Sequence, residues 1–329
     1  MKYLAPLILA WSFLAFVSEC CSSLPKDDEI LPTTISTHPS SEGKTSISFM
    51  GGSYFSGSYQ AGIIDYLLKN FDLSETRFVG DSSGAMCVVG AALEFEGEQI
   101  LDFTIKCIKE KEKLPFKGVS SWGQIIERNL KALIREKYPT GNIRKLVKNR
   151  LSFSVTHVLF FKIPYFNIEI PYGWKGELIS DFKTVDEVLE GMLVSCQIPG
   201  LPNPNVFAKF RGNTYLDGGF ANSNPKLDKN TCLINPFLWR DMDFWAIHGN
   251  FTLPTEEQAR QAFKWGYEDA EENCRYFVNH GFKMKSSLPT VIEESGFSLS
   301  TAIKEPAIHY PYPLAKLYRF SQGAKAMYS

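Results

Sequence analysis

The chain has 329 residues, of which 44% are hydrophobic, 14% aromatic and 22% charged, which is too apolar a composition for an intrinsically disordered protein. The 35 basic and 36 acidic residues give a formal net charge of −1, and the absence of a long basic run argues against nucleic acid as a partner. The length allows one large or two ordinary domains, and we expect one, over residues 46–285.

The N-terminal residues 1–21 predict a signal peptide or a signal anchor. Met1 and Lys2 precede an apolar stretch from Tyr3 to Val17, and small and polar residues follow it, which is the layout of a secretory signal. A membrane span needs roughly 20 apolar residues, so cleavage is favoured over anchoring. We therefore expect a protein of the secretory pathway or one associated with a membrane.

Two further segments show no periodic pattern of hydrophobic residues. Residues 22–45 are rich in Ser, Thr and Pro, which predicts a disordered linker. Residues 286–329 form a C-terminal tail in which no element is assigned.

Strands and helices alternate between these two segments. The periodicity predicts strands at 45–50, 78–79, 151–156, 163–170 and 214–216, and helices at 58–71, 85–95, 99–112, 121–137 and from 255 to about 280. Such alternation is typical of an α/β fold with a mainly parallel central sheet.

A glycine-rich turn follows the first predicted strand. It reads Gly51-Gly52-Ser53-Tyr54-Phe55-Ser56-Gly57 and precedes a helix. Backbone N–H groups in such a turn can bind a phosphate or a developing oxyanion. The Walker pattern is absent, because no Gly-Lys-Ser/Thr follows.

The second predicted strand runs into Gly80-Asp81-Ser82-Ser83-Gly84, a GxSxG pattern placed before a buried helix. In a nucleophile elbow the chain turns so sharply that Gly80 and Gly84, on either side of Ser82, have no room for side chains. The helix N-terminus is then aimed at the serine. The alternative interpretation is a tight turn in which Ser82 caps the helix.

A third motif, Asp217-Gly218-Gly219, places an acidic residue at the end of a predicted strand. Taken alone, an Asp-Gly pair is more often a structural turn. With a nucleophile elbow about thirty residues further on, an oxyanion hole is the better use of the glycine-rich turn.

No metal site is indicated by the sequence. The cysteines beyond the N-terminal segment are Cys87, Cys107, Cys196, Cys232 and Cys274, and none of them has CxxC spacing. Cys87 lies in an apolar run and is predicted to be a buried small hydrophobe.

The order of the three motifs resembles that of the patatin-like phospholipase domain. Residues 150–156, 217–225 and 266–270 are similar to the animal adipose triglyceride lipase subgroup, and the resemblance covers about residues 46–285. It implies a three-layer α/β fold with a mainly parallel central sheet and helices on both faces.

The resemblance also implies a role for each motif. Ser82 would be the nucleophile and Asp217 its base, without a histidine. The backbone of Gly52, Ser53 and Tyr54, closed by Gly57, would form the oxyanion hole. Gly80 and Gly84 would flank the nucleophile, and Gly218 and Gly219 would follow the base. Tyr54 stands where the family has glycine, and a positive φ there would strain a tyrosine.

The implied reaction is hydrolysis of fatty-acyl esters of triacylglycerol or phospholipid, with no metal or cofactor. The lipid substrate would be met at a membrane or lipid-droplet surface, and relatives of this subgroup make the lipid droplet or cytoplasm an alternative location. Several aromatic residues could line an acyl groove, and the cluster from Phe237 to Trp245 is a candidate membrane contact; these residues are Phe160, Phe161, Tyr165, Phe166, Trp174, Phe237, Trp239 and Trp245.

Two other functions stay open. A conventional α/β-hydrolase would use a histidine, with His248, His280 and His309 as candidates. A catalytically inactive lipid-binding protein that keeps the fold is the other alternative, and Tyr54 is the residue that favours it.

Overall fold

The computed structural model describes residues 44–113, 122–163, 168–199, 204–235, 238–240 and 254–285, which all belong to one structural unit. The predictions for residues 1–21 and 286–329 lie outside the described residues, as do those for all but the last two residues of 22–45.

A mixed sheet of seven strands forms the centre of this unit, in the order β6-β7-β4-β3-β1-β8, with β5 paired to β4. β1 pairs in parallel with β3 and β8, and β3 pairs in parallel with β4. β5 and β7 run antiparallel to β4, and β6 runs antiparallel to β7. A separate two-stranded sheet joins β2 and β9. The strands are β1 (Ser46–Phe49), β2 (Phe71–Asp72), β3 (Arg77–Gly80), β4 (Leu151–Ile163), β5 (Ile168–Ile179), β6 (Ala208–Phe210), β7 (Asn213–Asp217), β8 (Cys232–Ile234) and β9 (Lys283–Met284).

The parallel centre of the sheet is fully enclosed. Ile47 and Phe49 of β1 and Phe78 and Val79 of β3 have no exposed surface, as expected for parallel strands covered on both faces. The helices that flank the sheet are α2 (Ser53–Asn70), α3 (Ser83–Ala92), α4 (Gly97–Glu112), α5 (Trp122–Lys137), α6 (Arg144–Val147), α7 (Val185–Ser195), α8 (Glu256–Glu272) and α9 (Cys274–Asn279). The predicted α/β fold is therefore confirmed.

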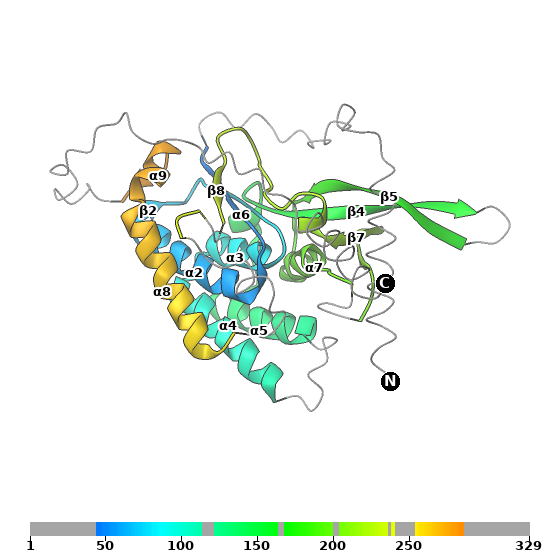
Figure 1. Ribbon diagram of the computed structural model, residues 1–329, viewed down its shortest axis with the longest axis horizontal. Helices are drawn as coiled ribbons and strands as arrows, with labels where there is room; N and C mark the ends of the chain where they lie inside the picture. Colours follow the sequence, from blue (N-terminus) through cyan, green and yellow to red (C-terminus); the bar gives the residue numbers. More distant parts are fainter. Residues whose placement is uncertain are drawn as a thin grey trace, which may run out of the picture. The chain divides into compact units, whose positions relative to one another are not determined.

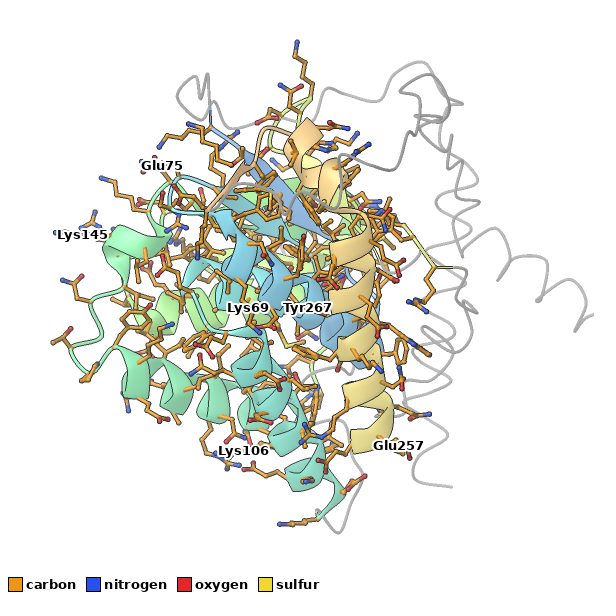
Figure 2. The ribbon with its side chains drawn as sticks, turned by 90° about the vertical axis from the view of Figure 1, so that its left-hand side faces the viewer. Lys69, Glu75, Lys106, Lys145, Glu257 and Tyr267 are labelled. Atoms are coloured by element: carbon orange, nitrogen blue, oxygen red, sulfur yellow. The ribbon has the colours of Figure 1, made fainter. Side chains whose placement is uncertain are left out.

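Helix α8 lies along α2 (Figure 1). The backbones approach closely because Gly62 of α2 faces Phe263 of α8, and a Cβ atom at Gly62 would overlap the Phe263 carbonyl oxygen. Further along α2, the Lys69 ammonium group lies 5.4 Å from the centre of the Tyr267 ring (Figure 2). The packing against α8 fixes the position of α2, the helix that begins at the glycine-rich turn.

Several predicted elements differ from the observed ones, and strand β4 runs to Ile163 rather than ending at residue 156. Helix α2 begins at Ser53, directly after Gly52, rather than near residue 58. The predicted strand at 163–170 is wrong: β4 ends at Ile163, β5 begins at Ile168, and these two residues pair antiparallel. The single predicted helix after residue 255 is two helices, α8 and α9, with Asn273 between them.

Within the described part of the chain, no helix combines the length and the apolar character that a membrane span requires.

Candidate active site

Ser82 occupies a sharp turn between β3 and α3. Its backbone adopts φ 51° and ψ −126°, a strained conformation for a residue with a side chain. The flanking glycines are sterically required, because a Cβ atom at Gly80 would lie 2.5 Å from the Gly84 carbonyl oxygen and one at Gly84 would overlap that of Phe49. The turn therefore has the geometry expected of a nucleophile elbow.

The hydroxyl group of Ser82 does not cap helix α3. Ser82 stands at the N-cap position, yet its side chain makes no capping hydrogen bond. The capping interpretation of this serine is therefore wrong, and the hydroxyl remains available to other groups at the helix N-terminus.

The backbone of Ser82 is held by the C-terminal end of α7. Its N–H donates to both the carbonyl oxygen and the hydroxyl of Ser195, at 3.2 and 3.1 Å. The Ser195 hydroxyl donates in turn to the Ser154 carbonyl at 2.7 Å, and the Cys196 thiol donates to the Ser82 carbonyl at 3.0 Å. Sequence reasoning missed these residues, because nothing local in the sequence links α7 to the elbow.

Asp217 is the last residue of β7, and a 3₁₀ turn over Gly218–Phe220 follows it. Its Oδ1 accepts a hydrogen bond from the Gly219 N–H at 2.8 Å. Its backbone is fixed on both sides, since its N–H donates to the Gln197 carbonyl at 2.7 Å and its carbonyl accepts from the Thr156 hydroxyl at 2.7 Å. The strand end therefore places this carboxyl group firmly in the protein interior.

The carboxyl group of Asp217 lies beside the hydroxyl of Ser82. Burial raises the pKa of Asp217 to about 6, while the Gly219 N–H and the Ser82 hydroxyl act to lower it. Its Oδ2 is buried and has no hydrogen-bond partner among the described residues. An oxygen in that position is able to accept a proton from the neighbouring serine.

The turn after β1 approaches the same place. A Cβ atom at Gly51 would lie 2.7 Å from the Ser82 Cβ atom, so this turn touches the elbow directly. Gly52 has φ 156°, in the region that favours glycine. Helix α2 starts at the next residue, with no side-chain cap, so its first N–H groups have no partners within the helix.

Two of the residues predicted for the oxyanion hole lie elsewhere than expected. Tyr54 is in the first turn of α2 and is not among the residues with positive φ. The expected backbone strain is absent, because within the glycine-rich turn only Gly52 takes that conformation. Gly57 does not close the glycine-rich turn but lies in the second turn of α2.

A further acidic residue of the site, Asp81, was not predicted. It is the second residue of the Gly80–Gly84 motif and is 1% exposed. The available signal was a charged residue at a junction between an apolar strand and a buried helix. Burial, followed by the charge of Asp217, raises the pKa of Asp81 well above its usual value, whereas the N–H groups of Gly51 and of Asp81 itself lower it.

An apolar pocket lies between α2, α3, α4 and α5. Its cavity volume is about 30 Å³, and its walls include Gly57, Ser83, Met86, Phe95, Phe103 and Leu133. Ser83 follows Ser82 in the chain, so the pocket adjoins the elbow.

None of the described aromatic residues that we expected in an acyl groove borders this pocket. Phe161 is 57% exposed on the β4–β5 hairpin, and Trp239 packs against Tyr276 and Phe277 of α9. Phe237 and Trp245, which end the predicted membrane-contact cluster, lie outside the described residues, as do Tyr165 and Phe166.

The described histidines bind other partners. His157 Nδ1 lies 2.9 Å from the Glu177 carboxylate, and His280 Nδ1 lies 2.7 Å from the Tyr276 carbonyl oxygen. His248 and His309 are outside the described residues. Over the ranges that the structure covers, no three His, Cys, Asp or Glu side chains gather as metal ligands.

A family model described as patatin-like phospholipase matches residues 47–227, a range that contains Ser82, Asp217 and the glycine-rich turn. Human 1-acylglycerol-3-phosphate O-acyltransferase PNPLA3 is 28% identical over 202 residues, which are 58% of this chain and 37% of that protein. Mouse omega-hydroxyceramide transacylase is 26% identical over 187 residues, 55% of this chain and 28% of that protein. The chain thus spans less than half the length of either relative.

Human patatin-like phospholipase domain-containing protein 5 is also similar, with 26% identity over 207 residues, which are 60% of this chain and 43% of that protein.

Proposed function

The chain belongs to the patatin-like phospholipase family, and from that premise we propose that it cleaves fatty-acyl esters by means of a Ser82–Asp217 dyad. Enzymes of this family are lipid acyl hydrolases and transacylases. The observation that carries the proposal is the strained Ser82, whose hydroxyl is free of capping and lies beside the buried Asp217 carboxyl group.

The proposed reaction uses these two side chains in sequence. The Ser82 Oγ attacks the ester carbonyl carbon while its proton passes to the Asp217 carboxylate. The tetrahedral intermediate then expels the alcohol, which takes the proton back from Asp217. Water attacks the acyl-serine in the same way, its proton passing through Asp217 to Ser82 Oγ, and releases the fatty acid.

Burial makes an aspartate a better base than it is in water. With a pKa of about 6, Asp217 is ionised at neutral pH, yet it holds a proton more tightly than an exposed aspartate does. The remaining barrier has to be lowered by donors that stabilise the oxyanion. The uncapped start of α2 after Gly52 supports that role, and a single such donor is typically worth about 10²- to 10³-fold in kcat.

The apolar pocket beside α3 favours a fatty-acyl chain as the bound part of the substrate. Its walls are mainly apolar, and they include Ser83, the residue after the proposed nucleophile. An acyl chain entering it would leave its ester group near Ser82.

The hairpin of β4 and β5 is our candidate for contact with a lipid surface. It extends beyond the other strands (Figure 1) and carries Phe161, Ile170 and Tyr172, which are 57%, 45% and 67% exposed. Phe161 and Ile170 are cross-strand partners, so their side chains share one face of the hairpin. Exposed apolar groups on one face favour insertion into a membrane or droplet surface.

Transfer of the acyl group to a lipid alcohol is the second candidate. Two relatives carry names that describe acyl transfer, an acylglycerol-phosphate acyltransferase and a ceramide transacylase. Transfer would use the same acyl-serine, with an alcohol in place of water. Free fatty acid and a new ester are therefore the two products to be distinguished.

The experiment compares four variants of the full chain with the wild type. A fluorophosphonate probe and a butyryl ester report on the serine, and labelled triacylglycerol and phospholipid vesicles identify the substrate. Ser82→Ala should abolish labelling and turnover, and Asp217→Asn should lower kcat by at least 10³-fold. The matched controls, Ser74→Ala and Asp102→Asn, change exposed residues and should behave like the wild type.

Retained labelling in Ser82→Ala would refute the proposed nucleophile. Failure of the wild type to label or to turn over any of the esters would favour the inactive lipid-binding alternative. A loss of activity by orders of magnitude in a single substitution of His248, His280 or His309 would favour a histidine-dependent mechanism.

The cellular location of the protein is a proposal that does not depend on the proposed reaction. Residues 1–21 would direct it to the secretory pathway or to a membrane, and N-terminal sequencing of the mature protein from expressing cells checks whether this segment is removed.

A further inference from the structure

Asp81 lies where three segments of the site meet. Its Oδ2 would be 2.8 Å from a Cβ atom at Gly51 and 3.4 Å from one at Gly219, and its Cβ would be 3.0 Å from one at Gly218. The Gly51 N–H is a hydrogen-bond donor to its carboxyl group. One carboxyl group therefore touches both the turn after β1 and the turn that follows Asp217.

Asp81 and Asp217 form a buried pair of carboxyl groups. Asp81 is 1% exposed and Asp217 is 5% exposed. Oδ1 of Asp81 and Oδ2 of Asp217 are both buried and have no hydrogen-bond partner among the described residues. Two anionic carboxylates so close together in the interior are strongly disfavoured, so such a pair retains a proton over a wide pH range.

The surroundings of Asp81 supply no compensating positive charge. The groups that act on it are Asp217 of β7 and the N–H groups of Gly51 and Asp81 itself. Burial raises the pKa of the Cys196 thiol, after α7, and the charges of Asp217, Asp81 and Cys87 of α3 raise it further. Among the described residues, none of the groups that act on Asp81 is cationic.

The environment also decides which carboxyl group carries the proton. Asp217 accepts a hydrogen bond from the Gly219 N–H, and this N–H and the nearby Ser82 hydroxyl both lower its pKa, which burial raises to about 6. Asp81 is buried beside the charge of Asp217, and both effects favour its neutral form. Our proposal therefore assigns the retained proton to Asp81 and the negative charge to Asp217.

We propose that Asp81 is a positioning residue that works as a neutral carboxylic acid, holding the Gly51 turn against Ser82 without placing a second negative charge beside the oxyanion. This inference rests on the proposed ester-cleaving function. Because the Asp81 carboxyl group touches Gly51, its ionisation would put an anion next to the turn where negative charge develops in the transition state. Electrostatic stabilisation of the oxyanion would then be lost.

A bell-shaped pH profile follows for kcat/KM. The rate rises through about pH 6, as Asp217 loses its proton, and falls at alkaline pH, as Asp81 loses its own. Ionisation of Cys196 is the competing cause of an alkaline fall, because its thiol donates to the Ser82 carbonyl. The substitution Cys196→Ser keeps a donor at that position and removes the titration.

The test measures kcat/KM for a soluble butyryl ester from pH 5 to 10 in a pH-stat. Asp81→Asn, which is neutral and of the same shape, should keep kcat at pH 7.5 within about tenfold, retain the acid limb and lose the alkaline limb. Asp81→Ala should lower kcat at least tenfold with little change in KM, because the Gly51 N–H loses its partner. Cys196→Ser should keep both limbs.

Three outcomes would overturn the role of Asp81: a wild-type profile with no alkaline fall, an alkaline limb that persists in Asp81→Asn, or an Asp81→Asn variant as inactive as Asp81→Ala at every pH. The wild-type pH profile tests the proposal even if a variant fails to fold. Labelling of Ser82 by the fluorophosphonate separates the two proposals, since labelled protein with an unchanged alkaline limb refutes only the role of Asp81.

Discussion

The N–H of Ser82 points to Ser195, where it meets both the carbonyl oxygen and the hydroxyl group, at 3.2 and 3.1 Å. Through its own bond to the Ser154 carbonyl, this hydroxyl links the elbow to β4. A residue at the end of α7 thus holds the strained backbone of Ser82 in place, although it belongs to none of the motifs.

Replacing Ser195 should therefore weaken the site without touching the substrate. Ser195→Ala removes the donor to Ser154 and one of the two acceptors for Ser82, and each such bond is worth about 1 kcal/mol. We expect the free energy of unfolding to fall by about 1–3 kcal/mol and kcat to fall about tenfold, with KM unchanged. Urea unfolding and ester kinetics measure the two effects, with Ser74→Ala as the control; an unaltered kcat would contradict this role.

The raised pKa of Asp217 makes a prediction about stability. Because the folded protein binds this proton more tightly than the unfolded chain, the associated stability is complete below pH 3.8 and is lost as the pH rises through about 6. Asp217→Asn avoids that loss, which corresponds to about 3 kcal/mol. The inactive variant should therefore have a higher melting temperature than the wild type at pH 7.5.

Calorimetry at pH 7.5 and pH 4 checks this prediction. The advantage of Asp217→Asn should shrink strongly at pH 4, and Asp102→Asn, at an exposed position, should show no such difference. A variant less stable than the wild type at pH 7.5 would mean that the ionised carboxylate stabilises the fold.

The pocket beside α3 predicts a dependence on acyl-chain length. A Cβ atom at Gly57 would meet no other atom within 4 Å, so a larger side chain there can extend into the pocket. In Gly57→Leu, we expect kcat/KM for a hexadecanoyl ester to fall at least tenfold more than for a butyryl ester. Turnover of esters of graded chain length measures the shift, and an equal loss at all lengths would place the acyl chain elsewhere.

The β4–β5 hairpin predicts binding to a lipid surface. The double substitution Phe161→Ser and Ile170→Ser removes two exposed apolar side chains from one face and should lower the fraction of protein that sediments with phospholipid vesicles about tenfold. Val278→Ser removes another exposed apolar residue, on α9, and serves as the control. Equal sedimentation of the two variants would exclude the hairpin as the contact.

The fold class followed from alternating periodicity, and the main errors arose where that periodicity is ambiguous. Residues 163–170 have an apolar pattern that favours one strand, but antiparallel pairing places Ile163 opposite Ile168. The glycine-rich turn is shorter than predicted, because α2 begins at Ser53. In both places, interactions with neighbouring elements decide where a helix or strand begins and ends. Local sequence propensity does not include these interactions.

By itself, the sequence determined the features that depend on near neighbours. Gly80 and Gly84 around Ser82 specify a sharp turn, since the steric limits act within a few residues. The family resemblance paired Ser82 with Asp217, and only the tertiary structure decided what else lies around that turn: Ser195 on the Ser82 amide, and Asp81 against Gly51. These contacts join segments far apart in the chain, and they depend on sheet register and helix packing, which no short stretch of sequence fixes.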